Sequence, residues 1–290
     1  MKAHIVRLKH FGEPITRLRC QKPAGVTSLV ADLGILWAVF GEQGFVQNTT
    51  FGAPGQCKNP LLEYVHSKAL SGPAQNSIVS CATGCRNIKE WPVIRNVRGS
   101  GSSGGCAIDS ALVRVLSFEN CKLDRMNGLF SDNTALELIE FNNVDTSGCG
   151  IMTTTFQNCY SLKRLPPLDF TSVTDMNFFL VANTSLEPTW LDLSAATLLK
   201  RVVCAGNGNT KRLNGLKGLI VSPRAPFNAA SPQINVSYSG LERPALLALF
   251  ESLPAVTAGQ KINITAAEGA ALLTQQDLDI ALNKGWQIIR

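Results

Sequence analysis

The stretch that decides the fold reads Met126-Asn-Gly-Leu-Phe130-Ser-Asp-Asn133-Thr-Ala-Leu136. Its spacing returns twice: a methionine, a large apolar residue four positions on, a small residue three further, and a leucine three further. The residues at these repeat positions are Met126, Phe130, Asn133, Leu136, Met152, Phe156, Cys159, Leu162, Met176, Leu180, Asn183 and Leu186. The copies start 26 and then 24 residues apart. A period of this length is typical of a solenoid, in which each unit buries its apolar face against its neighbours.

The final leucine of each copy belongs to a longer series of apolar anchors. They are Leu62, Ile88, Leu112, Leu136, Leu162 and Leu186, separated by 26, 24, 24, 26 and 24 residues. Each anchor opens a short strand-like phrase, such as Leu112 with Val115, or Leu162-Lys-Arg-Leu165. After Leu186 the spacing tightens, and Leu199–Cys204 and Leu216–Val221 are predicted to be strands joined by shorter returns.

A small residue stands three positions before most of these anchors, as Cys85, Asp109, Asn133, Cys159 and Asn183. We expect it to hydrogen-bond backbone groups that the bend between strands leaves unpaired.

The C-terminal part combines strands with helices. Strands are predicted at 234–236, 262–264 and 286–289, where Ile234, Ile262 and Ile288 lie 28 and 26 residues apart. Helices are predicted at 244–253, which starts with a proline, and at 275–283, with Thr274 as N-cap. This part is therefore expected to continue the repeat and to cap it.

The predicted fold class is an α/β solenoid with repeats of about 24–26 residues, short strands, more helical C-terminal repeats and a small β-rich N-terminal segment. Three domains are expected: an N-terminal cap or docking segment, 1–58, the repeat solenoid, 59–225, and the C-terminal strand–helix repeats, 226–290. Within the first, Ile5–Lys9 and Ile15–Cys20 suggest a β-hairpin.

Composition limits the function classes. The chain of 290 residues is 45% apolar and 17% charged, which favours a substantial core over disorder. Its net charge of +6 comes from scattered basic residues, so a nucleic-acid partner is not expected. The N-terminus has no secretory signal pattern and no apolar run is long enough to cross a bilayer, so no membrane insertion is expected.

The sequence carries no convincing catalytic pattern. Gly99-Ser-Gly101-Ser-Ser-Gly104 matches a dinucleotide-type glycine motif literally, but it lies between two anchors and is interpreted as an insertion loop. The nine cysteines form no zinc set. Repeat-position Cys85 and Cys159 lie too far apart to bridge, whereas pairing among Cys20, Cys57, Cys121, Cys149 and Cys204 stays open. We expect no enzyme activity, no catalytic, metal or cofactor-binding residues, and no cofactor.

One candidate binding surface is a basic stripe. Lys163-Arg164 and Lys200-Arg201 each follow an anchor leucine, and Lys211-Arg212 lies nearby in sequence. Equivalent positions of a solenoid stack, so these side chains are predicted to line up and to bind an anionic glycan or an acidic protein surface. The alternative is an ordinary solvated face.

Phe156 to Leu168, with its Phe-x-x-Cys-x-Ser-Leu-x-x-Leu-Pro-x-Leu pattern, resembles the BspA-like leucine-rich repeat. Thr171 to Met176 resembles a variant from bacterial surface proteins, and Leu241 to Trp286 is similar to the end of repeat proteins in phage tail and adhesion genes. The resemblance covers about 59–290.

The resemblance implies assembly or adhesion. The expected function is a non-enzymatic structural or adhesion protein of a tailed-phage virion, in a tail, baseplate, collar or fibre, made in the host cytoplasm. The expected partners are other virion proteins, copies of itself within the particle, and a host-surface glycan or protein. The alternatives are a bacterial leucine-rich repeat adhesin or scaffold and, third, a glycan-active enzyme.

Overall fold

The structure is a computed structural model that describes residues 112–227, 232–257 and 259–290, and the backbone of six short strands before residue 112. The chain divides into two units, one of Met1–Gly148 with Leu165–Pro167 and one of Cys149–Arg164 with Leu168–Arg290. The fold is mixed α/β: all paired strands are parallel, and the described residues form two α-helices and one short 3-10 helix. No described helix has the length and apolar character needed to cross a membrane.

The described strands of the first unit form three parallel sheets. Their strand orders are β1-β2-β3, β4-β5-β7-β9 and β6-β8. The strands are β1 (Val6–Arg7), β2 (Ser28–Val30), β3 (Tyr64–His66), β4 (Leu70–Ser71), β5 (Ile94–Arg95), β6 (Arg98–Ser100), β7 (Val115–Glu119), β8 (Lys122–Arg125) and β9 (Leu138–Asn142).

Three of these strands bear on predictions for the N-terminal half. β1 pairs in parallel with β2. The hairpin predicted from Ile5–Lys9 and Ile15–Cys20 stays a prediction, because residues 15–20 lie outside the described part. β2 pairs with β3, so this sheet draws strands from both sides of the boundary predicted at residue 58. Gly99 and Ser100, predicted to lie in an insertion loop, belong to β6, which pairs with β8; residues 101–104 are not described.

The register of β7 on β9 corrects one predicted anchor. Leu116 pairs with Ile139, a step of 23 residues, so the counterpart of Leu136 is Val113 rather than Leu112. Val113 and Leu116 are buried, whereas Leu112 and Val115 are exposed. A slip of one residue moves a strand's apolar set to the other face, and the anchor at Leu112 is wrong for that reason.

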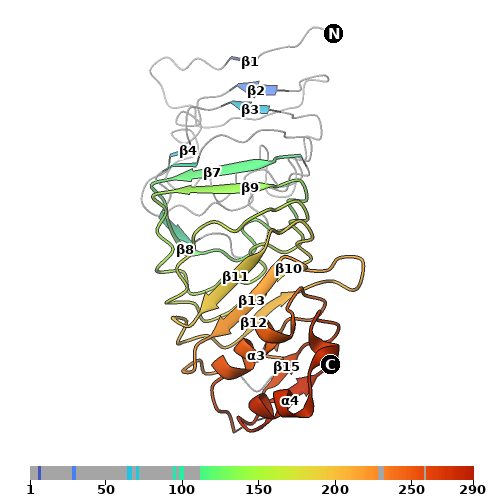
Figure 1. Ribbon diagram of the computed structural model, residues 1–290. Helices are drawn as coiled ribbons and strands as arrows, with labels where there is room; N and C mark the ends of the chain where they lie inside the picture. Colours follow the sequence, from blue (N-terminus) through green and yellow to red (C-terminus); the bar gives the residue numbers. More distant parts are fainter. Residues whose placement is uncertain are drawn as a thin grey trace. The chain divides into compact units, whose positions relative to one another are not determined.

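The second unit contains two parallel sheets and both helices (Figure 1). One sheet has the order β10-β12-β14-β15-β16, with β10 (Met176–Val181), β12 (Val202–Ala205), β14 (Ile234–Asn235), β15 (Lys261–Asn263) and β16 (Gln287–Ile289). The other pairs β11 (Thr189–Leu193) with β13 (Leu216–Val221). The predicted row of Ile234, Ile262 and Ile288 is confirmed, because these three residues pair in register.

The two sheets explain why the predicted spacing tightens after Leu186. β11 does not pair with β12, the next strand along the chain, but with β13: Leu191 lies beside Leu219, a step of 28 residues. β12 pairs instead with β10, and Met176 lies beside Val202, a step of 26 residues. The predicted shorter returns are therefore wrong, since each repeat here contributes one strand to each sheet.

The strand predicted at Leu162–Leu165 is also absent. Residues 162–170 form no strand, although the Lys163 carbonyl accepts a hydrogen bond of 2.8 Å from the Glu187 backbone N–H. Pro166 and Pro167 follow directly, and proline cannot donate to a ladder.

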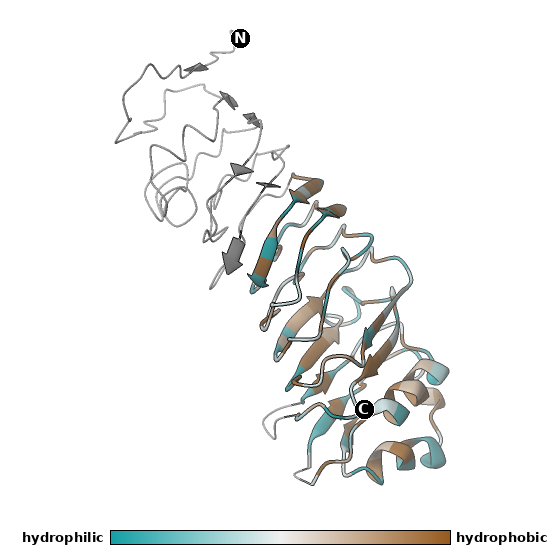
Figure 2. Ribbon diagram, turned by 90° about the vertical axis from the view of Figure 1, so that its left-hand side faces the viewer, coloured by the Kyte–Doolittle hydropathy of each residue, from teal (hydrophilic) through white to brown (hydrophobic). Residues whose placement is uncertain are grey.

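The repeat positions form the interior of the described part. All twelve are buried, eleven of them at 0% exposure and Leu186 at 6%. In the second unit the Phe156 ring meets the Phe179 ring edge to face, with centroids 5.2 Å apart. Figure 2 shows brown, hydrophobic segments along the strands of the second unit, with teal, hydrophilic segments between them.

Two α-helices follow the strands of the last repeats. α3 (Arg243–Ser252) begins with Pro244 in its first turn and packs on β13, burying Leu246, Leu249 and Phe250. The 3-10 helix η1 (Ala270–Leu272) and α4 (Gln275–Leu282) follow β15. Thr274 is the N-cap of α4 and forms a capping box with Asp277, so both predicted helices and this cap are confirmed.

Candidate functional site

The most distinctive exposed surface of the second unit is the outer face of β11 and β13. Side chains alternate in β11, so Trp190 and Asp192 face outward while Leu191 and Leu193 are buried. In β13, Gly218 lies beside Trp190 and Ile220 beside Asp192. We call these four residues the outer-face cluster.

Trp190 is 69% exposed, although Gly218 supports its ring from below. A Cβ atom placed on Gly218 would lie 2.1 Å from Cδ1 and 2.8 Å from Nε1 of Trp190, which shows that this edge of the indole rests on the glycine backbone. Any other residue at 218 would displace the ring. The glycine thus holds the tryptophan low over the sheet while most of its surface stays in solvent.

Asp192 is the ionisable member of the cluster. The backbone N–H of Ser194 donates to its Oδ1 at 2.9 Å. The hydroxyl and the backbone N–H of Ser194 lower the pKa of the Asp192 carboxyl below its usual value. The exposed face of β11 therefore presents an aromatic ring and, two residues away, a carboxylate that stays ionised at neutral pH.

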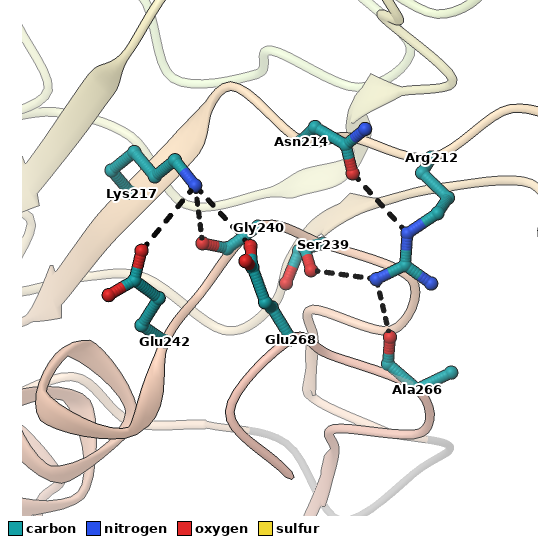
Figure 3. A network of polar contacts seen from close by, with 8 residues as sticks. All are labelled: Arg212, Asn214, Lys217, Ser239, Gly240, Glu242, Ala266 and Glu268. Atoms are coloured by element: carbon teal, nitrogen blue, oxygen red, sulfur yellow. Dashed lines mark hydrogen bonds and ion pairs between the residues drawn. The ribbon is translucent and has the colours of Figure 1, made fainter.

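Lys217, next to Gly218, reaches across the following two repeats (Figure 3). Its Nζ donates to the Gly240 carbonyl at 3.3 Å and lies 3.4 Å from Glu268 Oε2 and 3.9 Å from Glu242 Oε1. The sequence reasoning left out Lys217, even though it follows Leu216 as Lys163 and Lys200 follow their leucines.

The predicted basic stripe separates into distinct places. The Lys163 backbone carbonyl accepts from the Glu187 N–H, whereas the Lys200 N–H donates to the Thr174 carbonyl and the Arg201 carbonyl accepts from the Met176 N–H. Lys163-Arg164 therefore lies beside the residues that lead into β11. Lys200-Arg201 lies beside the residues that lead into β10. The two pairs do not stack on one another. Lys163, Arg164 and Lys200 are exposed and Arg201 is half-buried.

The third pair of the stripe makes intramolecular contacts. Lys211 Nζ donates to the Tyr160 hydroxyl at 2.5 Å and lies 4.1 Å from the centre of the Tyr160 ring. Arg212 Nη2 donates to the backbone carbonyls of Ala266 at 2.9 Å and Ser239 at 3.3 Å, and its Nε donates to Asn214 Oδ1 at 3.3 Å (Figure 3). Both side chains bond to residues one or two repeats away, so the geometry gives them a structural role.

The buried asparagines of the repeat positions bond to backbone. Asn133 Nδ2 donates to the Phe130 carbonyl at 3.0 Å, and Asn183 Nδ2 donates to the Cys159 carbonyl, 24 residues earlier, at 3.3 Å. The expected hydrogen bonding of this position is confirmed for both residues. Asn183 thereby links two neighbouring repeats inside the core.

A second repeated feature, a turn closed by an Asp or Asn side chain, was not predicted from the sequence. Short turns begin at Asp145, Asp169, Asp192, Asn235 and Asn263, and in each turn the side-chain oxygen accepts from the backbone N–H two residues on. The signal in the sequence is an Asp/Asn-x-Ser/Thr pattern, which all five positions share. Hydrogen bonds from Ser147, and to a smaller extent from Lys122, lower the pKa of the Asp145 carboxyl to about 2.

The described cysteines are part of the interior. Cys121, Cys149, Cys159 and Cys204 are buried and carry thiols rather than disulfides. Burial raises the pKa of the Cys204 thiol. The other cysteines lie outside the described residues. Within the described ranges no three His, Cys, Asp or Glu side chains gather as metal ligands would.

Comparison with known proteins adds no relative. The chain matches no protein-family model, no curated protein sequence and no solved structure.

Proposed function

We propose that the chain is a leucine-rich repeat solenoid that works as a non-enzymatic recognition and assembly protein of a tailed-phage virion. Its place would be a tail, baseplate, collar or fibre, where the repeat surface binds other virion proteins or the host surface and where copies of the chain assemble.

The observation that carries this proposal is the residue-for-residue pairing of strands from successive repeats. Leu191 lies beside Leu219 in one sheet, and Ile234 beside Ile262 and Ile262 beside Ile288 in the other. Repeats that pair this way bring equivalent outward positions of neighbouring repeats side by side, and rows of such positions build the broad surfaces that repeat proteins use for binding. The virion setting draws on the resemblance of Leu241–Trp286 to the end of repeat proteins in phage tail and adhesion genes.

The outer-face cluster favours a binding role. At protein binding surfaces, tryptophan contributes more binding energy than most residue types. Trp190 is held in its exposed position by Gly218, so its exposure is built into the sheet.

Mass spectrometry of purified particles tests the virion proposal. We expect peptides of this chain in particles of the phage that encodes it, at a constant ratio to the major tail protein after density-gradient purification. Absence from the particles, with recovery from a bacterial cell envelope, would instead support a bacterial adhesin or scaffold.

A digestion assay tests the non-enzymatic part. Incubation of the purified chain with host polysaccharide is expected to release no oligosaccharide. Release that disappears when an exposed carboxylate such as Asp192 is changed to asparagine would establish a glycan-active enzyme and overturn the proposal.

A further inference from the structure

We propose that Trp190 is a stacking platform for a pyranose ring of a neutral glycan. The inference rests on the proposed function and names the ligand class of its surface. It follows from three properties of the outer-face cluster: the held ring, the neighbouring acceptor and the mixed polar and apolar character of the cluster.

The first property is the way the ring is held. Because the Cδ1–Nε1 edge of Trp190 rests against Gly218, the indole has little freedom to move toward the sheet, and binding costs less conformational entropy than it would for a mobile side chain. The remaining surface of the ring faces solvent, with 69% of the residue exposed. The C–H groups on one face of a sugar ring are apolar and suit the negative face of an aromatic ring.

The second property is the acceptor beside the ring. Asp192 lies two residues along the same exposed face, a distance of about 7 Å for a strand. An ionised carboxylate only accepts hydrogen bonds, and sugar hydroxyls are donors. A ring stacked on Trp190 would therefore place its edge hydroxyls within reach of Asp192.

The third property is the mixed character of the cluster, in which Trp190 lies beside Gly218 and Asp192 lies beside the half-buried Ile220. The other exposed large apolar residues of this unit belong to other elements: Phe178 to β10, Leu198 to the turn after β11, Leu272 to η1, Leu282 to α4 and Ile289 to β16. A protein interface buries a contiguous apolar centre that is depleted of charge. A single ring beside a carboxylate fits a saccharide better than a protein partner.

The charge of the cluster selects among glycans. Asp192 is the only ionisable member of the outer-face cluster, and the nearby Lys217 is already paired with Glu242 and Glu268. An acidic sugar bound on Trp190 would bring its own negative charge next to Asp192. Neutral hexoses and N-acetylhexosamines avoid that repulsion.

A glycan array that spans neutral and acidic structures tests the proposal with the full-length chain. We expect binding to neutral glycans, loss of roughly tenfold or more in affinity in Trp190→Ala, and retention of most affinity in Trp190→Phe, which keeps a ring. Leu198→Ala is the matched control, because it removes an exposed apolar side chain outside the cluster and should bind as the parent does. Thermal melting of each variant separates lost binding from lost folding.

Two further measurements place the ligand on the ring. In a ¹H–¹⁵N spectrum, the indole N–H signal that disappears in Trp190→Phe identifies Trp190, and this signal should shift saturably with the best neutral glycan. Asp192→Asn should weaken the binding of that glycan and reduce the discrimination against acidic glycans.

Three results would overturn the inference: no glycan bound by the parent chain, binding unchanged in Trp190→Ala, or binding confined to acidic glycans. If the chain is found in particles but binds no glycan, only this inference fails. If it binds neutral glycans through Trp190 but is absent from particles, only the virion setting fails.

Discussion

Residues 149–227 and 232–290 continue the same parallel sheet, but they complete each repeat differently. In the first region a repeat contributes two strands, β10 with β11 and then β12 with β13. In the second, β14 is followed by α3, and β15 by η1 and α4. Figure 1 shows α3 and α4 beside the strands of the last repeats.

The difference shows which half of the repeat is constrained. The shared sheet is kept by inward residues that pair in register, Met176 with Val202 in the first region and Ile234 with Ile262 in the second. The other half is free to vary, because a helix satisfies its backbone hydrogen bonds internally and a strand needs a neighbouring strand. β11 and β13 therefore depend on each other, whereas α3 and α4 depend on caps and side-chain packing.

The largest expected effect comes from the interior of the first region. Phe156→Ala should lower the free energy of unfolding by roughly 3–5 kcal/mol, because the ring is fully buried against Phe179 and its loss leaves a cavity. Chemical denaturation measures the change. Leu198→Ala, a deletion at an exposed position, should cost less than about 0.5 kcal/mol, and equal losses in the two variants would refute the assigned register.

A glycine substitution tests the junction of the two regions. A Cβ on Gly240 would lie 2.0 Å from the backbone oxygen of Asn214, so Gly240→Ala must push neighbouring repeats apart and should cost about 1–3 kcal/mol. Gly150→Ala is the matched control, since its Cβ would lie 3.7 Å from the nearest atom, the Ser172 carbonyl oxygen. If both variants unfold at the same denaturant concentration, the repeats are not packed this closely.

In the second region, Asp277 should contribute to the free energy of unfolding in a way that depends on pH in the acid range. Arg243 donates to both carboxylate oxygens, at 2.9 and 2.7 Å, and this pairing, with the Thr274 backbone N–H, lowers the pKa of Asp277 to about 2. Because the folded-state pKa lies below the usual value of 3.8, the stabilisation is present above that value and is lost as the pH falls toward 2. Thermal melts should show a gap between the parent and Asp277→Asn that narrows over this acid range. A gap independent of pH would contradict the assignment.

The smallest effect is expected for the surface contact that bridges repeats at Lys217. A double-mutant cycle of Lys217→Met and Glu268→Gln should give a coupling of about 0.2–1 kcal/mol, since Glu268 is half exposed and solvent screens the pair. Added salt should reduce the coupling further. A coupling well above this range would mean that the pair is less hydrated than its exposure indicates.

The sequence predicted the second region better than the first. Pro244 in the first turn of α3 and Thr274 before α4 are local signals, because a cap or a helix start is decided within one turn. The apolar spacing of Ile234, Ile262 and Ile288 also predicted their pairing correctly. Outside the second region, one side-chain role was also predicted. The third repeat position was expected to hydrogen-bond backbone groups left unpaired at the bend, and Asn133 and Asn183 each donate to a backbone carbonyl.

The first region shows where sequence patterns fail. The phrases 186–191, 199–204 and 216–221 look alike in apolar spacing, yet β12 belongs to a different sheet from β11 and β13. Which strand pairs with which is decided by contacts some 26 to 28 residues away, and periodicity alone does not record them.

The outer-face cluster could not be predicted from spacing either. Its support is a glycine in a neighbouring strand, and neither Trp190 nor Gly218 occupies a repeated position. The basic stripe was placed by linear distance from leucines, which treated residues beside the start of β11 and residues beside the start of β10 as equivalent.

The central claim is that each repeat of residues 176–221 supplies one strand to each of two parallel sheets. Nuclear Overhauser effects between backbone protons of deuterated, selectively protonated protein test it directly, because adjacent strands lie only about 4.8 Å apart. We predict contacts of Leu191 with Leu219 and of Met176 with Val202. Contacts of Leu191 with Val202–Cys204, the next strand along the chain, would contradict the account.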